Sequence, residues 1–246
     1  MSTVYDWDRL TREEIGALAP SALAVIPVGT TEQHGPHLAT GTDTLIASCV
    51  ARLAAETATR PDAILLAPTL AYGASHHHLP FGGTLSLDVE MFQRVLHDLL
   101  SSAATSGCVR VFVVNAHGGN APSCVTAVTE ASREHGIVAA TALIADLVAP
   151  DDVEGPVRGH AGSFETSLML ELVADCVQLD RAAPSPGGAA RIRPRGLVVA
   201  EPGRWRELDG FTDRPDEASA VRGQAALAAC VRALALAFEE VAGLDV

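Results

Sequence analysis

The sequence predicts an α/β fold in which helices cover both faces of a mainly parallel sheet, as in a three-layer α/β/α sandwich. Short apolar runs rich in β-branched residues are typical of strands that are buried on both faces. Longer helical patterns alternate with these runs, as parallel strands joined by right-handed crossovers require. The 246 residues contain no repeat and no low-complexity linker, so we expect residues 1–246 to form a single domain.

The predicted elements follow one another in chain order. Strands are expected at Ala22–Val28, Ala63–Ala67, Val109–Val114 and Ile137–Ile144. Helical periodicity covers Asp43–Thr59, Leu87–Ser106, Ser123–His135, Phe164–Ala174 and Pro215–Ala242. A Pro- and Gly-rich stretch interrupts this order, and we expect a loop there that carries oligomer or substrate contacts, at Ala183–Gly196.

Composition and charge exclude several classes of function. The chain has 17 Lys and Arg against 30 Asp and Glu, a formal net charge of −13, and it lacks the basic stripe that nucleic-acid binding requires. No apolar run reaches the ~20 residues that span a bilayer, and the N-terminus has no secretory signal. We therefore expect no membrane partner and a cytoplasmic location. The five cysteines are scattered without a Cys-x-x-Cys pair, which favours reduced, structural thiols.

Four polar loops that contain glycine and histidine follow the predicted strands. They carry the segments "EQHGPHLATGTD" from Glu32, "YGASHHHLPFGGTLSL" from Tyr72, "NAHGGN" from Asn115 and "RGHAGSFETS" from Arg158. Loops that leave the carboxyl ends of parallel strands converge on one edge of the sheet. The sequence therefore predicts that their polar side chains meet in one site.

Three carboxylates and two imidazoles in these loops suit a divalent metal centre. Burying such a set without compensation costs several kcal/mol, which a bound cation can offset. Five ligands exceed what one catalytic zinc ion usually takes, so two ions that share a bridging carboxylate are favoured, with open positions for a water nucleophile. These ligand types suit Zn²⁺, and also Mn²⁺ or Fe²⁺. The five candidates are Glu32, His34, Asp43, His117 and Glu165.

Some of these residues have simpler explanations. Asp43 opens a predicted helix, so it can serve as an N-cap as well as a bridging ligand. His37 is either a support for the site or an ordinary loop residue, and Asn120 either fixes its loop or caps the next helix. Adjacent histidines point in different directions, so the run His76–His78 is not expected to bind one ion together. From this region we select His78 and Tyr72 as substrate-binding residues.

At these residues the chain resembles the creatininase superfamily of metal-dependent amidohydrolases. The matching segments, within a resemblance from about Leu10 to Leu234, are Pro27–Ala47, Tyr72–Leu87, Asn115–Asn120 and Gly159–Leu170. The resemblance implies a three-layer α/β/α fold and a binuclear centre, often zinc or zinc with manganese. Such a centre cleaves a carbon–nitrogen bond in a small, often cyclic, amide.

The resemblance also implies individual roles. Glu32 and His117 would hold one metal, His34 would hold the other, and Asp43 would bridge them. His160 matches the catalytic histidine, which handles the proton that goes to the leaving nitrogen or steadies the developing oxyanion.

One departure bears on the substrate. Creatininase proper carries a Tyr-Glu pair after the metal-binding histidine, where this chain has Gly118-Gly119. Glu165 is then the candidate to complete the second metal site, the alternative being a helix N-terminal Glu stabilised by the macrodipole. The two glycines are expected to border the substrate. Branches with the "HGGN" form include formamide deformylases of flavin-type cofactor synthesis and a peptidase that trims a redox-cofactor precursor.

Other features also point away from creatinine. The segment between Ile144 and His160 has no aromatic residue that would close over a flat ring, and the two tryptophans, Trp7 and Trp205, lie far from it in sequence. Four arginines could bind an anionic substrate: Arg158, Arg191, Arg193 and Arg195. For the last three, a solvated loop is the simpler explanation.

The sequence therefore predicts a metal-dependent amidohydrolase in which a metal-bridging hydroxide attacks a small amide, either linear or cyclic. One alternative places a formamide deformylase or a peptidase of cofactor or natural-product biosynthesis on the same metal site. Another is a metal- or ligand-binding scaffold without turnover, because intact ligands do not guarantee catalysis. The resemblance further implies a homo-oligomer, with a hexamer favoured.

Overall fold

The computed structural model describes residues 2–188, 199–201 and 203–245. Within them, five strands form a single sheet in the order β1-β3-β2-β4-β5, and every neighbouring pair is parallel. The strands are β1 (Thr3–Asp6), β2 (Leu23–Val28), β3 (Ala63–Leu66), β4 (Arg110–Asn115) and β5 (Val138–Leu143). The prediction of a mainly parallel sheet is confirmed, and the ends of the four predicted strands lie within one residue of those observed.

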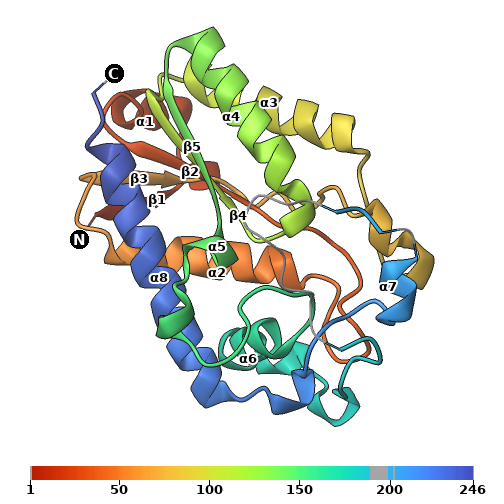
Figure 1. Ribbon diagram of the computed structural model, residues 1–246. Coiled ribbons are helices and arrows are strands. Elements are labelled where there is room, and N and C mark those ends of the chain that lie inside the picture. Colours follow the sequence, from red (N-terminus) through yellow and green to blue (C-terminus); the bar gives the residue numbers. More distant parts are fainter. Residues whose placement is uncertain (1, 189–198, 202, 246) are drawn as a thin grey trace.

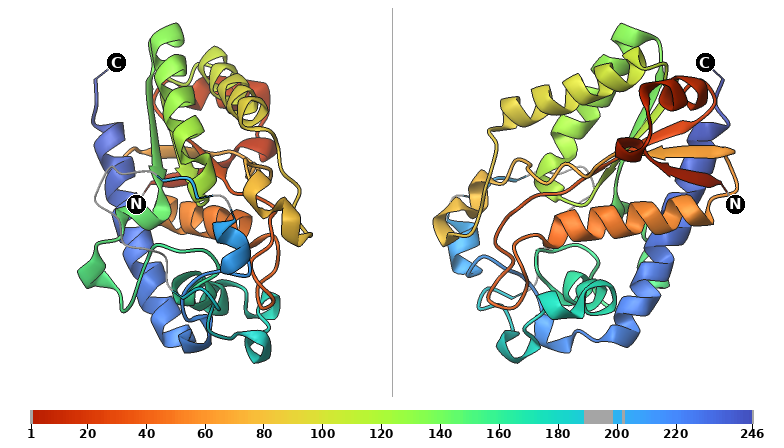
Figure 2. Two further views of the ribbon diagram at one scale, coloured as in Figure 1. Left: turned by 45° about the vertical axis from the view of Figure 1, so that its right-hand side comes forward. Right: turned by 180° about the vertical axis from the view of Figure 1, so that it is seen from behind.

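Helices cover both faces of the sheet, as Figures 1 and 2 show. One face packs against α3 (Val89–Thr105) and α4 (Ala121–His135). The other packs against α2 (Thr42–Thr57), α6 (Ser163–Leu172) and α8 (Ala220–Ala242). The predicted three-layer arrangement is therefore confirmed. The remaining described helices are short: α1 (Arg12–Leu18), α5 (Ile144–Leu147) and α7 (Arg204–Glu207).

Side chains of β4 alternate between the two cores, as strand geometry requires. Val111 and Val113 lie in the core beneath α3 and α4, whereas Phe112 and Val114 lie in the core beneath α2 and α8. β2, β3 and most of β4 are buried on both faces. The same expectation is wrong for β5, which is half-buried along its whole length because it forms one edge of the sheet.

Short 3-10 helices connect the larger elements. They are η1 (Trp7–Arg9), η2 (His76–Phe81), η3 (Gly118–Asn120), η4 (Pro150–Asp152), η5 (Ala174–Cys176), η6 (Leu179–Arg181) and η7 (Pro215–Glu217). The predicted last helix is therefore divided. Pro215–Glu217 forms a separate turn, and α8 begins after Ser219, whose hydroxyl accepts a hydrogen bond from the Arg222 amide.

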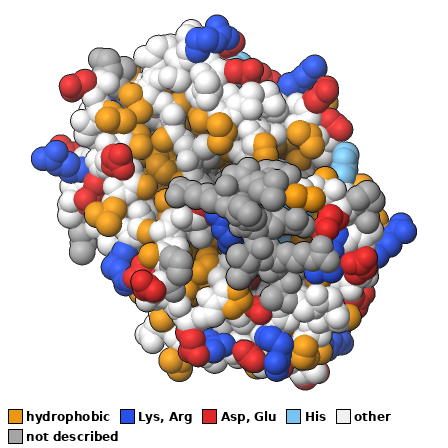
Figure 3. Space-filling view, in the orientation of Figure 1, with side chains coloured by type: hydrophobic (Ala, Val, Ile, Leu, Met, Phe, Trp, Pro, Cys, Tyr) orange, Lys and Arg blue, Asp and Glu red, His pale blue; other side chains and the backbone are white. Residues whose placement is uncertain are grey.

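The strand order determines which loops meet. β2 lies between β3 and β4, so the loops that leave the carboxyl ends of these three strands are neighbours at one edge of the sheet. In the face seen in Figure 3, acidic and basic side chains of the described residues are interspersed around the rim. Among the described helices, none combines the length and the apolar character needed to cross a membrane.

Candidate metal centre

Five buried polar residues meet where these loops converge. Glu32 and His34 come from the loop after β2, Asp43 from the first turn of α2, and His117 from the loop after β4. His160 comes from the long segment between β5 and α6. Their exposed fractions run from 0% for Glu32 and His34 to 6% for His160. Charged groups that are buried this deeply have to be paired with one another or with a cation.

Asp43 lies between two imidazole rings. Its Oδ1 is 3.1 Å from His34 Nε2, and its Oδ2 is 3.2 Å from His117 Nδ1. The Thr30 hydroxyl donates a hydrogen bond of 2.9 Å to Oδ2 and so fixes the carboxylate. Each oxygen therefore faces a different potential ligand, which is the arrangement that a bridging carboxylate requires. α2 begins at Thr42 with Gly41 as its N-cap residue, so Asp43 is not the N-cap itself.

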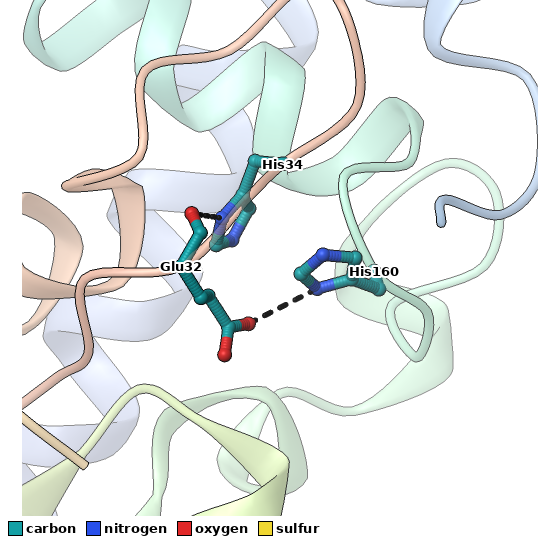
Figure 4. A group of neighbouring side chains, drawn as sticks. All are labelled: Glu32, His34 and His160. Atoms are coloured by element: carbon teal, nitrogen blue, oxygen red, sulfur yellow. Dashed lines mark hydrogen bonds and ion pairs between the residues drawn. The ribbon is translucent and has the colours of Figure 1, made fainter. Parts of the chain in front are cut away.

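Both imidazoles are held by backbone carbonyls through one ring nitrogen. His34 Nδ1 donates to the Glu32 carbonyl at 3.1 Å, as Figure 4 shows, and His117 Nε2 lies 3.3 Å from the Ala74 carbonyl. The other nitrogen of each ring then faces the carboxylates. Protein metal ligands are oriented in this way, with the second ring nitrogen bonded to a carbonyl or carboxylate.

Glu32 provides the clearest sign that a cation belongs here. Its Oε1 lies 3.2 Å from His117 Nδ1 and 3.4 Å from His160 Nδ1. Nevertheless, both of its carboxylate oxygens are buried without a hydrogen-bond partner among the described residues. Buried carboxylate oxygens rarely remain unsatisfied in native proteins. The donor set around Glu32 therefore fits a divalent cation.

Three groups of side chains bring potential ligand atoms within 4.8 Å of one another. One contains His34, Asp43 and Glu165, and the others are Glu32 with His77 and His117, and Glu32 with His34 and His160. Glu165 lies in the first turn of α6 and also accepts a hydrogen bond of 2.6 Å from the Ala161 amide. The structure thus brings all five predicted ligands and His160 together. Their roles as ligands stay predictions.

Electrostatics in this cluster favour positive charge at two of the imidazoles, those of His34 and His117. Burial alone would lower the pKa of His117, but the carboxylates of Asp43 and Glu32 raise it to about 10. At His34 burial also lowers the pKa, but the Asp43 carboxylate outweighs this effect and raises it to about 9. Burial raises the pKa of Glu165 to about 7. Divalent ions would compete with these protons for the same nitrogen and oxygen atoms.

His160 is fixed by its backbone and by one ring nitrogen. Its amide donates to the Thr212 hydroxyl, and its Nε2 donates to the Gln33 carbonyl at 2.8 Å. Because a carbonyl can only accept, Nε2 carries the proton, and Nδ1 faces Glu32. Burial is the largest cause that holds the pKa of His160 well below its usual value. The ring is therefore a neutral base whose free nitrogen is aimed at the carboxylates.

Two residues of the first motif support the cluster from behind. His37 is buried, and its Nε2 lies 3.1 Å from the Ala161 carbonyl and 3.0 Å from the Thr166 hydroxyl. Of its two explanations, the structure favours the supporting one. Gln33, which sequence reasoning missed, donates from Nε2 to His78 Nδ1 and to the Gly210 carbonyl, both at 2.7 Å. Its only signal in the sequence is its place between Glu32 and His34.

Asn120 fastens the three loops to one another. Its Oδ1 accepts a hydrogen bond of 2.9 Å from the Ala74 amide, and its Nδ2 donates to the Gly29 carbonyl at 3.2 Å. It precedes α4, but its side chain makes no hydrogen bond to that helix. The prediction that Asn120 fixes its loop is therefore favoured over the N-cap alternative.

The predicted substrate-binding residues occupy different environments. His78 is buried beside Glu32, whereas Tyr72 is about half exposed, at 48%. Gly118 is exposed, and no atom lies within 4 Å of the position that a Cβ would take there. At Gly119 a Cβ would lie 2.4 Å from His117 Nε2. Roles in substrate binding stay predictions for all four residues.

The predicted arginine contacts receive little support. Arg158 is paired with Asp146 at 2.7 Å, and its side chain is 78% exposed. The other three, Arg191, Arg193 and Arg195, lie outside the described residues, as does part of the Ala183–Gly196 segment. An aromatic residue does lie at the site, however. Trp205 of α7 contacts His78 and His160, and its distance along the chain gave no sign of this.

Comparisons with known proteins agree with this geometry. A sequence model of the family described as "Creatininase: Creatinine amidohydrolase" matches residues 8–238. The chain is 35% identical over 228 residues to a protein named mycofactocin precursor peptide peptidase from Mycobacterium ulcerans (strain Agy99), covering 87% of this chain and 82% of that protein. It is 31% identical over 250 residues to a protein named creatinine amidohydrolase from Pseudomonas putida, covering 92% of each.

Solved structures named creatininase share the fold. A mutant creatininase of the "Zn-Zn type" superimposes with a TM-score of 0.82 at 28% identity, covering 99% of this chain and 100% of that chain. A structure named "Creatininase Mn" superimposes with a TM-score of 0.80 at 29% identity and the same coverage.

Proposed function

The chain belongs to the creatininase family of amidohydrolases, and on this premise we propose that it is a binuclear metal-dependent hydrolase of an amide carbon–nitrogen bond. Glu32 and His117 would hold one ion, and His34 and Glu165 would hold the other. Asp43 would bridge them. The observation that carries the proposal is that Asp43 presents one oxygen to each of the imidazoles of His34 and His117.

We propose zinc as the preferred metal, with manganese or iron as the alternatives. Imidazole and carboxylate ligands suit these ions, and the titles of the two creatininase structures name zinc and manganese. Divalent ions bound there would make water a nucleophile at neutral pH and polarise the amide carbonyl.

The chain itself supplies orientation and proton transfer. Thr30 fixes the Asp43 carboxylate through its hydroxyl. The bond from His160 Nε2 to the Gln33 carbonyl determines the tautomer, so that Nδ1 is the atom that accepts a proton and delivers it to the leaving nitrogen. Because Glu32, His34 and His160 are almost fully buried, water is excluded and each of these interactions is strengthened.

The second candidate function is hydrolysis of a peptide bond or a formamide at the same centre. Similarity to a mycofactocin precursor peptide peptidase supports it. So does Gly118, because no side chain there fills the approach beside His117. The open space beside Gly118 can accommodate an amide substrate that is longer than a small ring. A peptide or formyl substrate is therefore the first alternative to a small linear or cyclic amide.

Two variants and a substrate screen test the proposal. His117→Ala should abolish both metal binding and turnover, whereas His160→Ala should keep two ions per subunit, measured by inductively coupled plasma mass spectrometry, and lose rate. Metal-replete protein should hydrolyse at least one of creatinine, cyclic imides, formamides and short peptides. Uniform inactivity would favour a scaffold without turnover. A His117→Ala protein with two ions and full activity would overturn the ligand assignment.

We also propose a homo-oligomer, with a hexamer favoured, in the cytoplasm. The support for the oligomer is the family resemblance, and the support for the location is the sequence composition. Analytical ultracentrifugation of the metal-replete protein checks the oligomer, because a monomer at micromolar concentration would contradict it. Cell fractionation checks the location.

A further inference from the structure

We propose that Trp205 forms an aromatic wall of the substrate pocket, and that the substrate carries a flat or apolar group next to its scissile amide. This inference rests on the proposed function, because it assumes that an amide reaches the metal centre. It adds a specificity-determining residue that lies outside all four sequence motifs.

The first observation is a set of ring contacts that leads from Trp205 into the ligand cluster. The indole centroid lies 4.6 Å from that of His78, 5.5 Å from that of His77 and 5.5 Å from that of His160. His78 stacks on His160 at 4.1 Å, and His77 stacks on His117 at 5.7 Å. Trp205 therefore touches the candidate catalytic histidine directly and is separated from the ligand His117 by one ring.

The second observation is exposure. His78, His117 and His160 are buried, with exposed fractions of 0%, 5% and 6%. Trp205 and His77 are only half-buried. These two rings therefore lie at the boundary between solvent and the buried carboxylates. A substrate whose carbonyl reaches that cluster has its neighbouring group close to this boundary, where the indole presents a flat apolar surface.

The third observation is that the chain after α7 is held in place without the indole. Leu208 and Phe211 are buried in the body of the protein, and their carbonyls accept hydrogen bonds from the Ser185 hydroxyl. The Gly210 carbonyl accepts a hydrogen bond from Gln33. These contacts position α7 relative to the cluster. The Trp205 ring is therefore free to serve a ligand, because the backbone does not depend on it.

The chemistry of the wall indicates the kind of group it would accept. An indole face favours aromatic rings and apolar chains, and a single aromatic pair contributes enough to change affinity severalfold. The nearby guanidinium of Arg204 is already paired with Glu207 at 3.1 Å. The structure therefore points to a flat or apolar neighbour of the amide in preference to an anionic one.

Three small chelators test the wall without knowledge of the natural substrate. Acetohydroxamate and benzohydroxamate share the metal-binding group and differ in a methyl against a phenyl substituent; N-phenylacetohydroxamate places the phenyl on the nitrogen side. Isothermal titration of the zinc-loaded protein gives the affinity of each. We expect a phenyl compound to bind more tightly than acetohydroxamate, and Trp205→Ala to reduce that preference roughly tenfold. Leu236→Ala, at a side chain of α8 that is 65% exposed, is the matched control.

Fluorescence gives a second measurement that does not depend on the Ala variant folding. The chain has two tryptophans, so Trp7→Phe leaves Trp205 as the only one. The phenyl compound should change the emission of this variant, and it should leave the emission of Trp205→Phe unchanged. Far-ultraviolet circular dichroism and metal content verify that each variant is folded and loaded.

The possible failures are distinguishable. If no hydroxamate binds to the zinc-loaded wild type, or zinc itself does not bind, the proposed metal centre fails. If all three bind and neither phenyl preference changes in Trp205→Ala, the metal centre stands and the aromatic wall is wrong. An emission change in Trp205→Phe, whose remaining tryptophan is Trp7, without a change in Trp7→Phe would also contradict the proposed aromatic wall.

Discussion

Two adjacent glycines allow the geometry around His117 to be tested with one substitution made at two positions. At Gly119, a Cβ would lie 2.4 Å from His117 Nε2 and 2.7 Å from the Ala74 carbonyl oxygen. At Gly118, no atom lies within 4 Å of the same position. Gly119→Ala should therefore disturb the metal centre, and Gly118→Ala should leave its metal content unchanged.

The magnitude follows from the distances. Ordinary contact begins at 3.4 Å, so the His117 ring has to move by 1.0 Å, the difference from 2.4 Å. A compensating shift of residue 119 toward the Ala74 carbonyl is blocked, because that oxygen is itself only 2.7 Å from the Cβ position. Metal–ligand distances tolerate only about 0.2 Å. A displacement of about 1 Å is enough to reduce turnover by about 10²-fold, and we expect a loss of metal affinity of at least about tenfold.

Metal content after dialysis against a graded zinc buffer, measured by mass spectrometry, is the primary assay. Thermal unfolding of the metal-free proteins separates a general loss of stability from a specific effect on the site. Gly119→Ala should lose metal at free zinc concentrations at which Gly118→Ala and the wild type retain it. Equal zinc affinities in the two variants would refute the argument that a Cβ at residue 119 displaces the His117 ring.

Three further predictions concern other parts of the molecule. Burial raises the pKa of Glu165 from 4.5 to about 7. Its ionisation therefore lowers folding stability progressively between these pH values, and by the full amount above them. Glu165→Gln should raise the Tm of metal-free protein at pH 8 and weaken zinc binding, whereas a lower Tm would contradict this reasoning. Cys108, Cys124 and Cys230 are buried, and burial raises the pKa of Cys108 to about 11 and of the other two to about 12. A thiol reagent at pH 8 should therefore reach only the half-buried Cys176 and, more slowly, Cys49, whose pKa burial also raises; all five thiols should react in denaturant, as counted by mass spectrometry. Ser219→Ala removes the cap of α8 and should cost about 1 kcal/mol, or about 2–4 °C in Tm, whereas Ser219→Asp should retain the wild-type value.

The parallel core of the fold could be predicted because its strands carry their own signal. β2 and β3 are apolar throughout, and β4 is apolar between Arg110 and Asn115, as strands with two covered faces must be. β1 escaped prediction because its sequence, Thr3–Asp6, is short and half exposed; it forms by pairing with the edge of β3, a tertiary cause that local propensity does not record. α1 did have a local signal, the capping box formed by Thr11 and Glu14.

The residues of the candidate site also fall into those that the sequence predicts and those that depend on tertiary contacts. Glu32, His34 and His117 lie close to the ends of their strands, and Asp43 lies in the first turn of the helix that follows the loop of Glu32 and His34. The topology alone therefore predicts that they meet. Gln33 and His37 act through hydrogen bonds to backbone atoms that are distant in sequence, and no residue pattern specifies those partners. Trp205 reaches the site because the chain around it is anchored at Leu208 and Gly210, which depends on packing across the whole domain.

The hydrogen bonds of Asn120 have a consequence for how proteins with this fold can diversify. One amide side chain joins the loops after β2, β3 and β4, so a displacement of any of them is transmitted to the other two. α7 lies outside this linkage. If Trp205 lines the substrate pocket as proposed, exchanging the side chains of α7 would change which compounds bind while the linked loops stay as they are.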